Sequence, residues 1–207
     1  MELCGGTFCG ESDFTAAVLA GGKGKRLGAD KTSLSIGGEP VLARIIAVLS
    51  GIFPRILLVG QERNHRLAEF AGDKARAVFD LLPGKGPLGG IYTALEYSTT
   101  PYVFVMACDM PHPQPGLIRR LLAEAPGWEA VVPRRGDYIE PLFAVYAREV
   151  RERIGSRLRE ERLKIHELTD ELRVRYLEEE EIAAYDPGFR SFFNINTPQD
   201  LEAASEP

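Results

Sequence analysis

Glycines and cationic side chains are interleaved in one segment of the sequence, residues 19–31 (LAGGKGKRLGADK). Glycine lets the backbone approach a ligand closely, so successive N–H groups can converge on phosphate oxygens while lysine and arginine side chains neutralise the charge. The spacing differs from that of a Walker A loop, and Gly22-x-Gly24-x-x-x-Gly28 misses the dinucleotide fingerprint by one residue. We therefore predict a phosphate-binding loop here, against the alternative of an ordinary loop between a strand and a helix.

A second glycine-rich segment, residues 84–90 (GKGPLGG), directly precedes a helical pattern. Backbone N–H groups at the start of a helix lie at the positive end of the helix dipole, so they can bind an anion or the edge of a nucleobase. Gly86, Pro87 and Leu88 are the candidates for this contact. The alternative is a tight loop that only begins the helix.

Two carboxylates follow apolar strand patterns. Asp109 comes after residues 102–107 (YVFVMA), and Asp80 ends the run ARAVFD. Mg²⁺ is usually bound by one or two carboxylates together with substrate phosphates, so Asp109 is the candidate metal ligand. Asp80 could assist it or bind a ribose. For both residues the alternative is a cap of a turn or a helix.

Asn194 and Asn196 are one residue apart, and they point to the same face if residues 193–196 are extended. The sequence Thr197-Pro198-x-Asp200 after them predicts an N-cap, a first-turn proline and a capping-box acid for the last helix. The two asparagines therefore either hold the start of this helix or face a ligand.

No convincing general base accompanies these residues in the sequence. His65, His112 and His166 lie far apart without metal-ligand spacing, and Cys108 has no activating base near it in the sequence. A base is unnecessary when the attacking group is already an anion such as a phosphate, because positioning and charge neutralisation then suffice. The candidate residues are therefore consistent with a phosphate as the attacking group.

The composition is that of a globular protein with one hydrophobic core. The chain has 207 residues, of which 44% are hydrophobic and 27% are charged. Its net charge of −5 argues against nucleic-acid binding, and its three cysteines are too few for a disulfide framework or a four-ligand zinc site. Because no apolar run is long enough for a membrane helix and no secretory signal is present, we expect a cytoplasmic protein without a membrane partner. We also expect a flexible lead-in over residues 1–12 and a single domain over residues 13–207.

Apolar runs alternate with helical patterns over the first 125 residues. Strands are expected at residues 14–20, 55–60, 75–80 and 102–107, and helices at residues 41–49, 64–71, 88–97 and 115–125. Pro40 is expected at the first helical position of the first helix. This alternation predicts an α/β fold with a mainly parallel sheet, which binds ligands at the carboxyl ends of its strands. Gly21, Asp80 and Asp109 all map to that edge.

The pattern is less regular after Trp128. Strands are expected within residues 127–133, 138–146 and 173–177, and one charged helix over residues 148–168. The acidic run at residues 178–181 is interpreted as the solvated start of a helix.

Five motifs carry a family resemblance and together span residues 19–201: LAGGKGKRLGADK, GPLGG, ACDMP, EPLFAVY and FFNINTPQDL. The chain resembles the molybdenum cofactor guanylyltransferases, which belong to a wider group of nucleotidyltransferases. The resemblance implies a three-layer, Rossmann-like fold and the Mg²⁺-dependent transfer of GMP from GTP to the terminal phosphate of molybdopterin. This transfer would release pyrophosphate and form the guanine dinucleotide cofactor. A molybdoenzyme or a cofactor-insertion protein is the protein partner that such an activity suggests.

The resemblance also implies roles for individual residues. The catalytic machinery would comprise Arg26 and Lys31 at the nucleotide phosphates and Asp109 at Mg²⁺. The residues implied to bind the nucleotide are Leu19, Ala20, Gly21, Gly22, Lys31, Asp80, Gly86, Pro87, Leu88 and Asp109. Asn194 and Asn196 would border the pterin. The motif LAGG, as opposed to LAAG, goes with guanine as the base.

Two positions depart from the pattern of some family members. Gly60 stands where those members have an asparagine, so that a base contact would have to come from elsewhere, for example from Gln61. Glu140-Pro141 stands where some members have His-Pro. Other functions remain as alternatives: cytidylyl transfer to the same pterin, nucleotidyl transfer to a sugar or polyol phosphate, or nucleotide and cofactor binding by a non-catalytic accessory protein.

Overall fold

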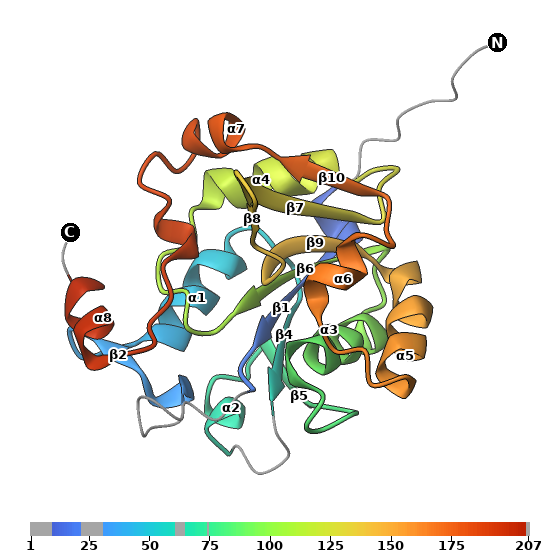
Figure 1. Cartoon of the computed structure of the whole chain (residues 1–207). Helices are drawn as coiled ribbons and strands as arrows, with labels where there is room; N and C mark the ends of the chain where they lie inside the picture. The colour runs from blue at the N-terminus through green and yellow to red at the C-terminus, as the bar shows by residue number, and fades with distance from the viewer. Residues whose placement is uncertain (1–9, 22–30, 61–64, 74, 206–207) are drawn as a thin grey trace.

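A computed structural model of the chain describes residues 10–21, 31–60, 65–73 and 75–205. In these residues one sheet combines eight strands in the order β10-β7-β9-β6-β1-β4-β5, with β8 paired to β7 (Figure 1). The strands of this sheet are β1 Phe14–Leu19, β4 Ile56–Gly60, β5 Ala75–Phe79, β6 Tyr102–Ala107, β7 Ala130–Arg135, β8 Tyr138–Ile139, β9 Phe143–Ala147 and β10 Val174–Leu177. A small hairpin outside the sheet pairs β2 Ser35–Ile36 with β3 Glu39–Pro40.

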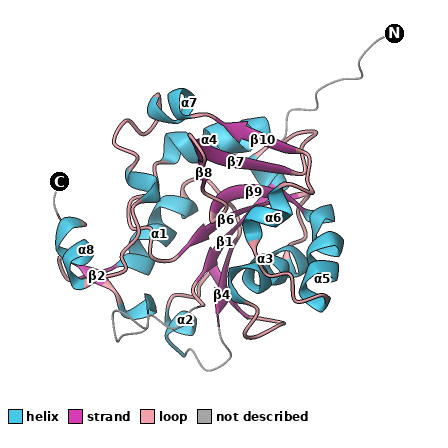
Figure 2. Ribbon diagram, viewed as in Figure 1, coloured by secondary structure: helices cyan, strands magenta, loops and turns pink. Residues whose placement is uncertain are grey.

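Helices cover both faces of the sheet, with α1 and α4 on one side and α3 and α5 on the other (Figure 2). The α-helices of the described residues are α1 Val41–Ser50, α2 His65–Glu69, α3 Gly86–Tyr97, α4 Pro115–Glu124, α5 Arg151–Arg159, α6 Ile165–Thr169, α7 Glu179–Ala183 and α8 Pro198–Ala203. Within the part of the chain that the structure describes, no helix has the length and apolar character needed to cross a membrane.

The hydrophobic core is split into two layers by the central strands. In β6, Phe104 and Met106 pack with α1 and α4, whereas Val103 and Val105 pack with α3 and α5. Successive side chains of a strand point to opposite faces, so a strand covered on both sides is apolar throughout. The expected α/β class, the three layers and the central place of residues 102–107 are thereby confirmed.

One edge of the sheet collects the ends of several strands. β1 runs parallel to both β4 and β6, and β4 runs parallel to β5, so their carboxyl ends lie together. β9 is antiparallel to β6, with Phe143 opposite Met106, so it is the amino end of β9 that lies at this edge. The edge therefore joins Gly21, Asp80 and Asp109 with the residues that precede β9.

Two of the expected helix boundaries are wrong. Pro40 is the N-cap of α1, paired in β3, rather than the first helical residue. The single helix expected over residues 148–168 is divided into a short 3₁₀ turn, α5 and α6. Glu161 has a left-handed backbone with φ 57°, which ends the helical path, and the carbonyl oxygen of Lys164 accepts a 3.1 Å hydrogen bond from the buried Arg157.

Two expected helix starts are confirmed. Glu178 caps α7 in a capping box with Glu181, and Thr197 caps α8 in a capping box with Asp200. Most of the predicted lead-in, residues 1–9, lies outside the described residues. Residues 11–13 of the chain form a 3₁₀ turn directly before β1.

Candidate functional site

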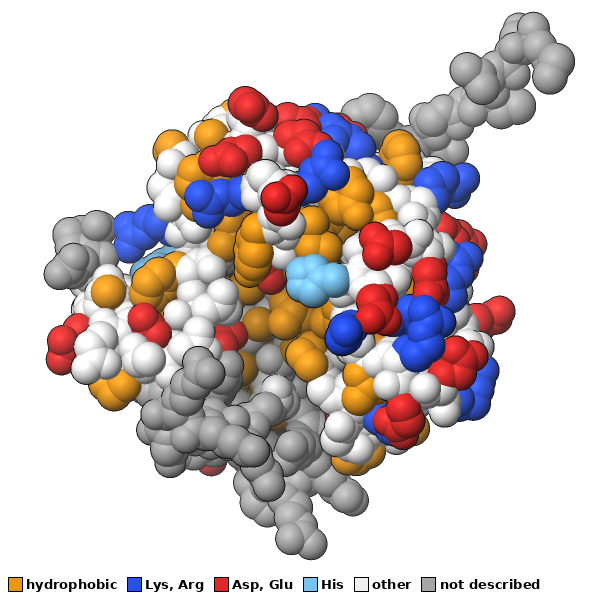
Figure 3. All heavy atoms as spheres, in the orientation of Figure 1, with side chains coloured by type: hydrophobic (Ala, Val, Ile, Leu, Met, Phe, Trp, Pro, Cys, Tyr) orange, Lys and Arg blue, Asp and Glu red, His pale blue; other side chains and the backbone are white. Residues whose placement is uncertain are grey.

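A cavity of about 490 Å³ opens at the carboxyl edge of the sheet. In the space-filling view the middle of this face, where Figure 1 shows β1 and β6, is hollowed and lined by hydrophobic side chains (Figure 3). The cavity is lined by Leu19, Gly21, Val59, Gly60, Asp80, Gly84, Gly86, Pro87, Gly90, Ala107, Cys108, Asp109, Leu142 and Asn194. Seven residues that the sequence nominated therefore share one cavity: Leu19, Gly21, Asp80, Gly86, Pro87, Asp109 and Asn194.

The other nominated residues are elsewhere or outside the described part of the chain. Ala20 and Leu88 are buried in the two core layers. Asn196 is exposed, and its backbone N–H donates a 2.9 Å hydrogen bond to Asp200. Gly22 and Arg26 lie outside the described residues, and Lys31 belongs to the 3₁₀ turn Lys31–Ser33, in which its side chain is not described. Gln61 also lies outside the described residues.

Asp80 is held in place by Thr93 of α3 and by the turn that follows β5. Its Oδ1 accepts a 2.9 Å hydrogen bond from Thr93 Oγ1 and a 3.1 Å hydrogen bond from the backbone N–H of Leu82. Thr93 is fully buried and also accepts a hydrogen bond from the backbone N–H of Leu81. Asp80 thus caps the turn after β5, as the alternative interpretation expected, and it lines the cavity as well.

The start of α3 forms one wall of the cavity. Gly84 and Gly86 have positive φ angles of 86° and 63°, which turn the chain into the helix with Pro87 in its first turn. A Cβ atom on Gly90 would lie 3.3 Å from both methyl groups of Leu19, so a larger residue would require Leu19 to shift by a few tenths of an ångström. The helix begins two residues earlier than expected, and its first two residues, Gly86 and Pro87, line the cavity.

Asp109 lies between two segments of the chain that fix its backbone. The N–H of the preceding Cys108 donates a 3.2 Å hydrogen bond to Leu19 O, and Asp109 O accepts a 2.9 Å hydrogen bond from the N–H of Ile195. Asp109 lines the cavity although it is only 5% exposed. Cys108 is buried within the core, as expected for a packing role.

Asn194 reaches the cavity from the segment before α8. Its Nδ2 donates a 2.9 Å hydrogen bond to Phe192 O, so one of its two amide protons is used locally. The segment at residues 193–196 is not a strand, and Asn194 lines the cavity while Asn196 is exposed. The structure therefore separates two asparagines that the sequence treated as a pair.

Glu140 is a residue of this edge that the sequence noted only as a departure from a family pattern. It is 5% exposed and directly precedes the Pro141-Leu142 turn into β9. Burial raises the pKa of its carboxyl group, and the nearby charge of Asp109 acts in the same direction, while hydrogen bonds from Tyr138 and Leu142 oppose the rise. Its position was not predicted because β9 is antiparallel, which brings the start of a strand to the ligand edge.

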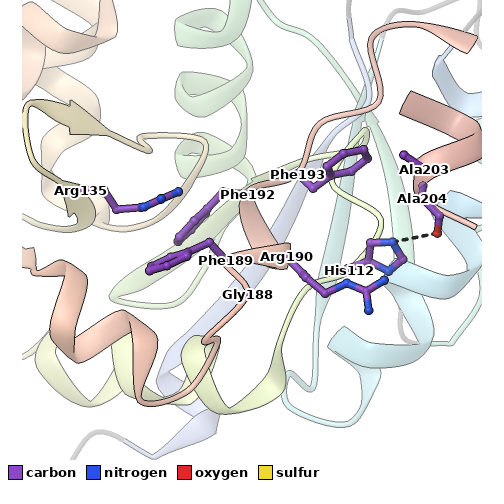
Figure 4. Close-up of a pocket in the computed structure, with 9 residues that line it drawn as sticks. All are labelled: His112, Arg135, Gly188, Phe189, Arg190, Phe192, Phe193, Ala203 and Ala204. Atoms are coloured by element: carbon purple, nitrogen blue, oxygen red, sulfur yellow. Dashed lines mark hydrogen bonds between the residues drawn. The ribbon is translucent and has the colours of Figure 1, made fainter. Parts of the chain in front are cut away.

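A second cavity, of about 330 Å³, is formed mainly by the segment that precedes α8 (Figure 4). Phe192 and Phe193 line it, whereas the next residue, Asn194, lines the first cavity. The Arg135 guanidinium lies 3.8 Å from the ring centroid of Phe189, and His112 Nε2 is 3.1 Å from Ala204 O. Partial burial, with the charge of Arg190, lowers the pKa of His112. None of the described residues that the sequence analysis assigned to the site lines this second cavity. They line the first cavity or lie outside both cavities.

The fold and the glycine-lined cavity with its two aspartates define an α/β nucleotidyltransferase. The chain belongs to the family with a MobA-like NTP transferase domain, whose model matches residues 16–174. A probable molybdenum cofactor guanylyltransferase of Pelotomaculum thermopropionicum is 36% identical over 192 residues, which cover 92% of this chain and 91% of the relative. The molybdenum cofactor guanylyltransferase of Syntrophotalea carbinolica is 32% identical over 191 residues, 91% of this chain and 89% of the relative. The family resemblance and the assignment as an enzyme are thereby confirmed.

Solved structures agree with this assignment. The molybdopterin-guanine dinucleotide biosynthesis protein A of Archaeoglobus fulgidus superposes with a TM-score of 0.81 at 30% identity, covering 92% of this chain and 96% of that one. A nucleotidyl transferase from Methanothermobacter superposes with a TM-score of 0.69 at 19% identity, covering 93% of this chain and 95% of that one. The second likeness shows the fold alone, and it places the expected three-layer architecture in a wider group of proteins.

Proposed function

We propose that this protein transfers GMP from GTP to the terminal phosphate of molybdopterin, releasing pyrophosphate and forming the guanine dinucleotide cofactor. The observation that carries the proposal is the single cavity that joins Gly21, Gly84 and Gly86 with the carboxylates of Asp80 and Asp109. Relatives named as molybdenum cofactor guanylyltransferases, similar over nine-tenths of the chain, support the same substrates.

The proposed nucleotide site lies between β1 and the start of α3. Backbone groups at Leu19, Gly21 and Gly86 bind the nucleotide, together with Ala20, Gly22, Pro87 and Leu88 of the same two segments. Asp80, held by Thr93, binds at the nucleoside. Arg26 and Lys31 neutralise the phosphates, and both residues belong to the glycine-rich segment that follows β1. Backbone contacts to a base edge leave polar groups unpaired with the wrong base, which favours guanine in this site.

Mg²⁺ suits the donors that the cavity offers. Asp109 presents a carboxylate at the cavity, and within the described residues no group of three or more His, Cys, Asp or Glu side chains forms a protein cage for a metal. Mg²⁺ is commonly held by one or two carboxylates and completed by substrate phosphates and water. Asp109 would therefore hold the ion, which when bound neutralises charge on the nucleotide phosphates.

The chemistry requires no proton transfer at the attacking atom. An anionic oxygen of the acceptor phosphate forms a bond to the α-phosphorus of GTP, and the bond from that phosphorus to the bridging oxygen of the β-phosphate breaks. The electron pair leaves with pyrophosphate. The protein therefore has to position two anions and neutralise their charge, which are the tasks of the glycine-rich segments and of Arg26, Lys31 and Asp109.

The remaining expectations belong to this proposal. Residues 13–207 act as one nucleotidyltransferase domain, and residues 1–12 precede it without a part in catalysis. The protein works in the cytoplasm, and its partners are GTP, molybdopterin and a molybdoenzyme or cofactor-insertion protein that receives the product, rather than nucleic acid or a membrane. Asn194 borders the acceptor, whereas the exposed Asn196 follows it towards the start of α8.

Pyrophosphate release tests the proposed function. The protein is incubated with ATP, CTP, GTP or UTP, each with molybdopterin or with a sugar phosphate, in the presence and absence of Mg²⁺. The proposal predicts release with GTP and molybdopterin only when Mg²⁺ is present. Equal release with CTP would move the assignment to cytidylyl transfer, and GTP binding without release under any condition would indicate an accessory protein.

A further inference from the structure

Glu140 lies just before β9, on the side of β6 away from the proposed nucleotide site, and the charge of Asp109 acts on its carboxyl group. The N–H of Ala107, at the end of β6, donates a 3.0 Å hydrogen bond to the carbonyl oxygen of Leu142, two residues after Glu140. β1, β4 and β5, which carry the nucleotide candidates, lie on the other side of β6 in the sheet. Asp109 follows β6 and thus divides the cavity into a nucleotide side and a β9 side.

The segment that carries Asn194 packs against β9, on the same side of the cavity as Glu140. Phe192 packs edge-on against Phe143 of β9, with ring centroids 5.5 Å apart. Leu142 and Asn194 both line the cavity. The β9 side therefore offers an apolar wall and an amide beside a buried carboxylate, which is a surface for a polar ring rather than for a phosphate.

The Glu140 carboxylate is fixed by two hydrogen bonds, one to each oxygen. Tyr138 Oη donates a 2.8 Å hydrogen bond to Oε2, and the N–H of Leu142 donates a 3.3 Å hydrogen bond to Oε1. Each carboxylate oxygen has two acceptor sites, so each keeps one for another donor. Burying a carboxylate is costly, and the nearby Arg134 and Arg135 pair with Glu178 and Glu179 rather than with Glu140. The charge of His166 only opposes the rise of the Glu140 pKa that burial causes. A buried carboxylate of this kind at a ligand edge is a candidate for function.

We propose that Glu140 selects the acceptor by accepting two hydrogen bonds from the ring N–H and the exocyclic amino group of its 2-amino-4-oxopyrimidine edge. This inference rests on the proposed function, which makes the acceptor a pterin. A carboxylate with two coplanar oxygens matches a pair of parallel N–H donors, as in bidentate ion pairs with arginine. Guanine carries the same edge, but the nucleotide candidates lie on the opposite side of Asp109.

The test compares two acceptor fragments that differ only in the group that Glu140 would bind. 6-Hydroxymethylpterin phosphate carries the 2-amino group, and 6-hydroxymethyllumazine phosphate carries an oxygen there. Binding is followed by ligand fluorescence with the full chain in the presence of Mg²⁺ and a nonhydrolysable GTP analogue. The wild-type protein is expected to prefer the pterin by about 10–100-fold, the discrimination typical of a bidentate contact to a ring edge.

Two substitutions connect this preference to Glu140. Glu140→Gln keeps the size of the side chain but replaces one acceptor by a donor, and it is expected to remove most of the preference without changing the affinity for the GTP analogue. Tyr138→Phe removes only the 2.8 Å hydrogen bond to Oε2, and it is expected to reduce the preference partially. Tyr138 is 56% exposed, so Tyr138→Phe is expected to leave the fold intact. This variant therefore tests the proposal even if Glu140→Gln does not fold.

Each contrary outcome has a distinct meaning. Equal binding of pterin and lumazine by the wild type, or an unchanged preference in both variants, would overturn the inference. A loss of GTP-analogue affinity in Glu140→Gln equal to the loss for the pterin would also overturn it, because the carboxylate would then serve the nucleotide or its metal. Selective pterin binding without pyrophosphate release from any nucleotide would support the Glu140 contact and contradict the proposed function.

Discussion

The backbone N–H of Ile195 donates a 2.9 Å hydrogen bond to the carbonyl oxygen of Asp109. This contact joins the segment before α8 to the loop after β6, although the two are far apart in the chain. It places the side chain of Asn194 on the same cavity as the carboxylate of Asp109. The proposed acceptor contact and the proposed metal ligand therefore depend on one backbone connection.

The two asparagines are expected to differ when replaced one at a time. Asn194→Ala should raise the KM for molybdopterin by about tenfold, because an amide that lines the cavity is lost, with little change in the KM for GTP. Asn196→Ala serves as the matched control and should leave both KM values nearly unchanged, because Asn196 is exposed. Equal effects of the two substitutions on the acceptor KM would contradict the assignment.

Asp109→Asn is expected to reduce Mg²⁺-dependent turnover by at least about a hundredfold, since it removes the anionic metal ligand from the site. The fold should persist, because the backbone contacts of Asp109 to Ile195 do not involve its side chain. Thermal unfolding followed by circular dichroism provides the control on the same preparation. Near-normal turnover at ordinary Mg²⁺ concentrations would exclude Asp109 as the ligand.

Thr93→Val is expected to affect both stability and nucleotide binding. The substitution removes the 2.9 Å hydrogen bond to Asp80 and leaves a buried site without its hydroxyl group, at a cost of about 1–3 kcal/mol of unfolding free energy. Asp80 then keeps only the hydrogen bond from the N–H of Leu82, so its side chain is held less firmly and the KM for GTP should rise.

Thr169→Val is the matched control for this experiment. Thr169 is also buried, and its hydroxyl donates a 2.7 Å hydrogen bond to His166 O rather than to a residue that lines the cavity. It should lower the melting temperature without raising the KM for GTP. If both variants raise the KM for GTP equally, the proposal that Thr93 supports the nucleotide site is wrong.

The stability of the protein should fall at acid pH through Glu181. Partial burial raises the pKa of this carboxyl group, but hydrogen bonds from Arg175, the backbone of Glu178 and Arg120 outweigh it and lower the pKa to about 2. Because the folded-state pKa lies below the unfolded value of 4.5, the stabilisation is present above that pH and is lost between about 4.5 and 2. Glu181→Gln should therefore lower the melting temperature near neutral pH, and the difference from the wild type should shrink towards pH 2. A difference that is constant over this range would refute the account of Glu181.

Those features of the fold that depend on neighbouring residues in the chain could be predicted from the sequence. β1 and β6 were predictable because strands buried on both faces form continuous apolar runs. Asp80 and Asp109 were assigned to the ligand edge because each follows a predicted strand. The cap of α8 was predictable because a capping box has a fixed spacing.

The parts of the site that depend on tertiary contacts were not predictable in the same way. Glu140 reaches the ligand edge only because β9 pairs antiparallel to β6, and this direction is not encoded in the residues around Glu140. The pairing of Asn194 with Asn196 assumed an extended segment, whereas the N–H of Asn196 is directed to Asp200. The charged stretch after β9 has a helical pattern throughout, but the buried Arg157 holds the carbonyl oxygen of Lys164 and the chain turns between α5 and α6.

The fate of the α-phosphate tests the central claim most directly. Molybdopterin and Mg²⁺ are incubated with the protein and with GTP that carries a radioactive label on either the α- or the γ-phosphate. The account predicts that the α-label enters a product with the mass of the guanine dinucleotide and that the γ-label is released as pyrophosphate. Recovery of the α-label in GTP or free GMP, with no label joined to the pterin, would contradict it.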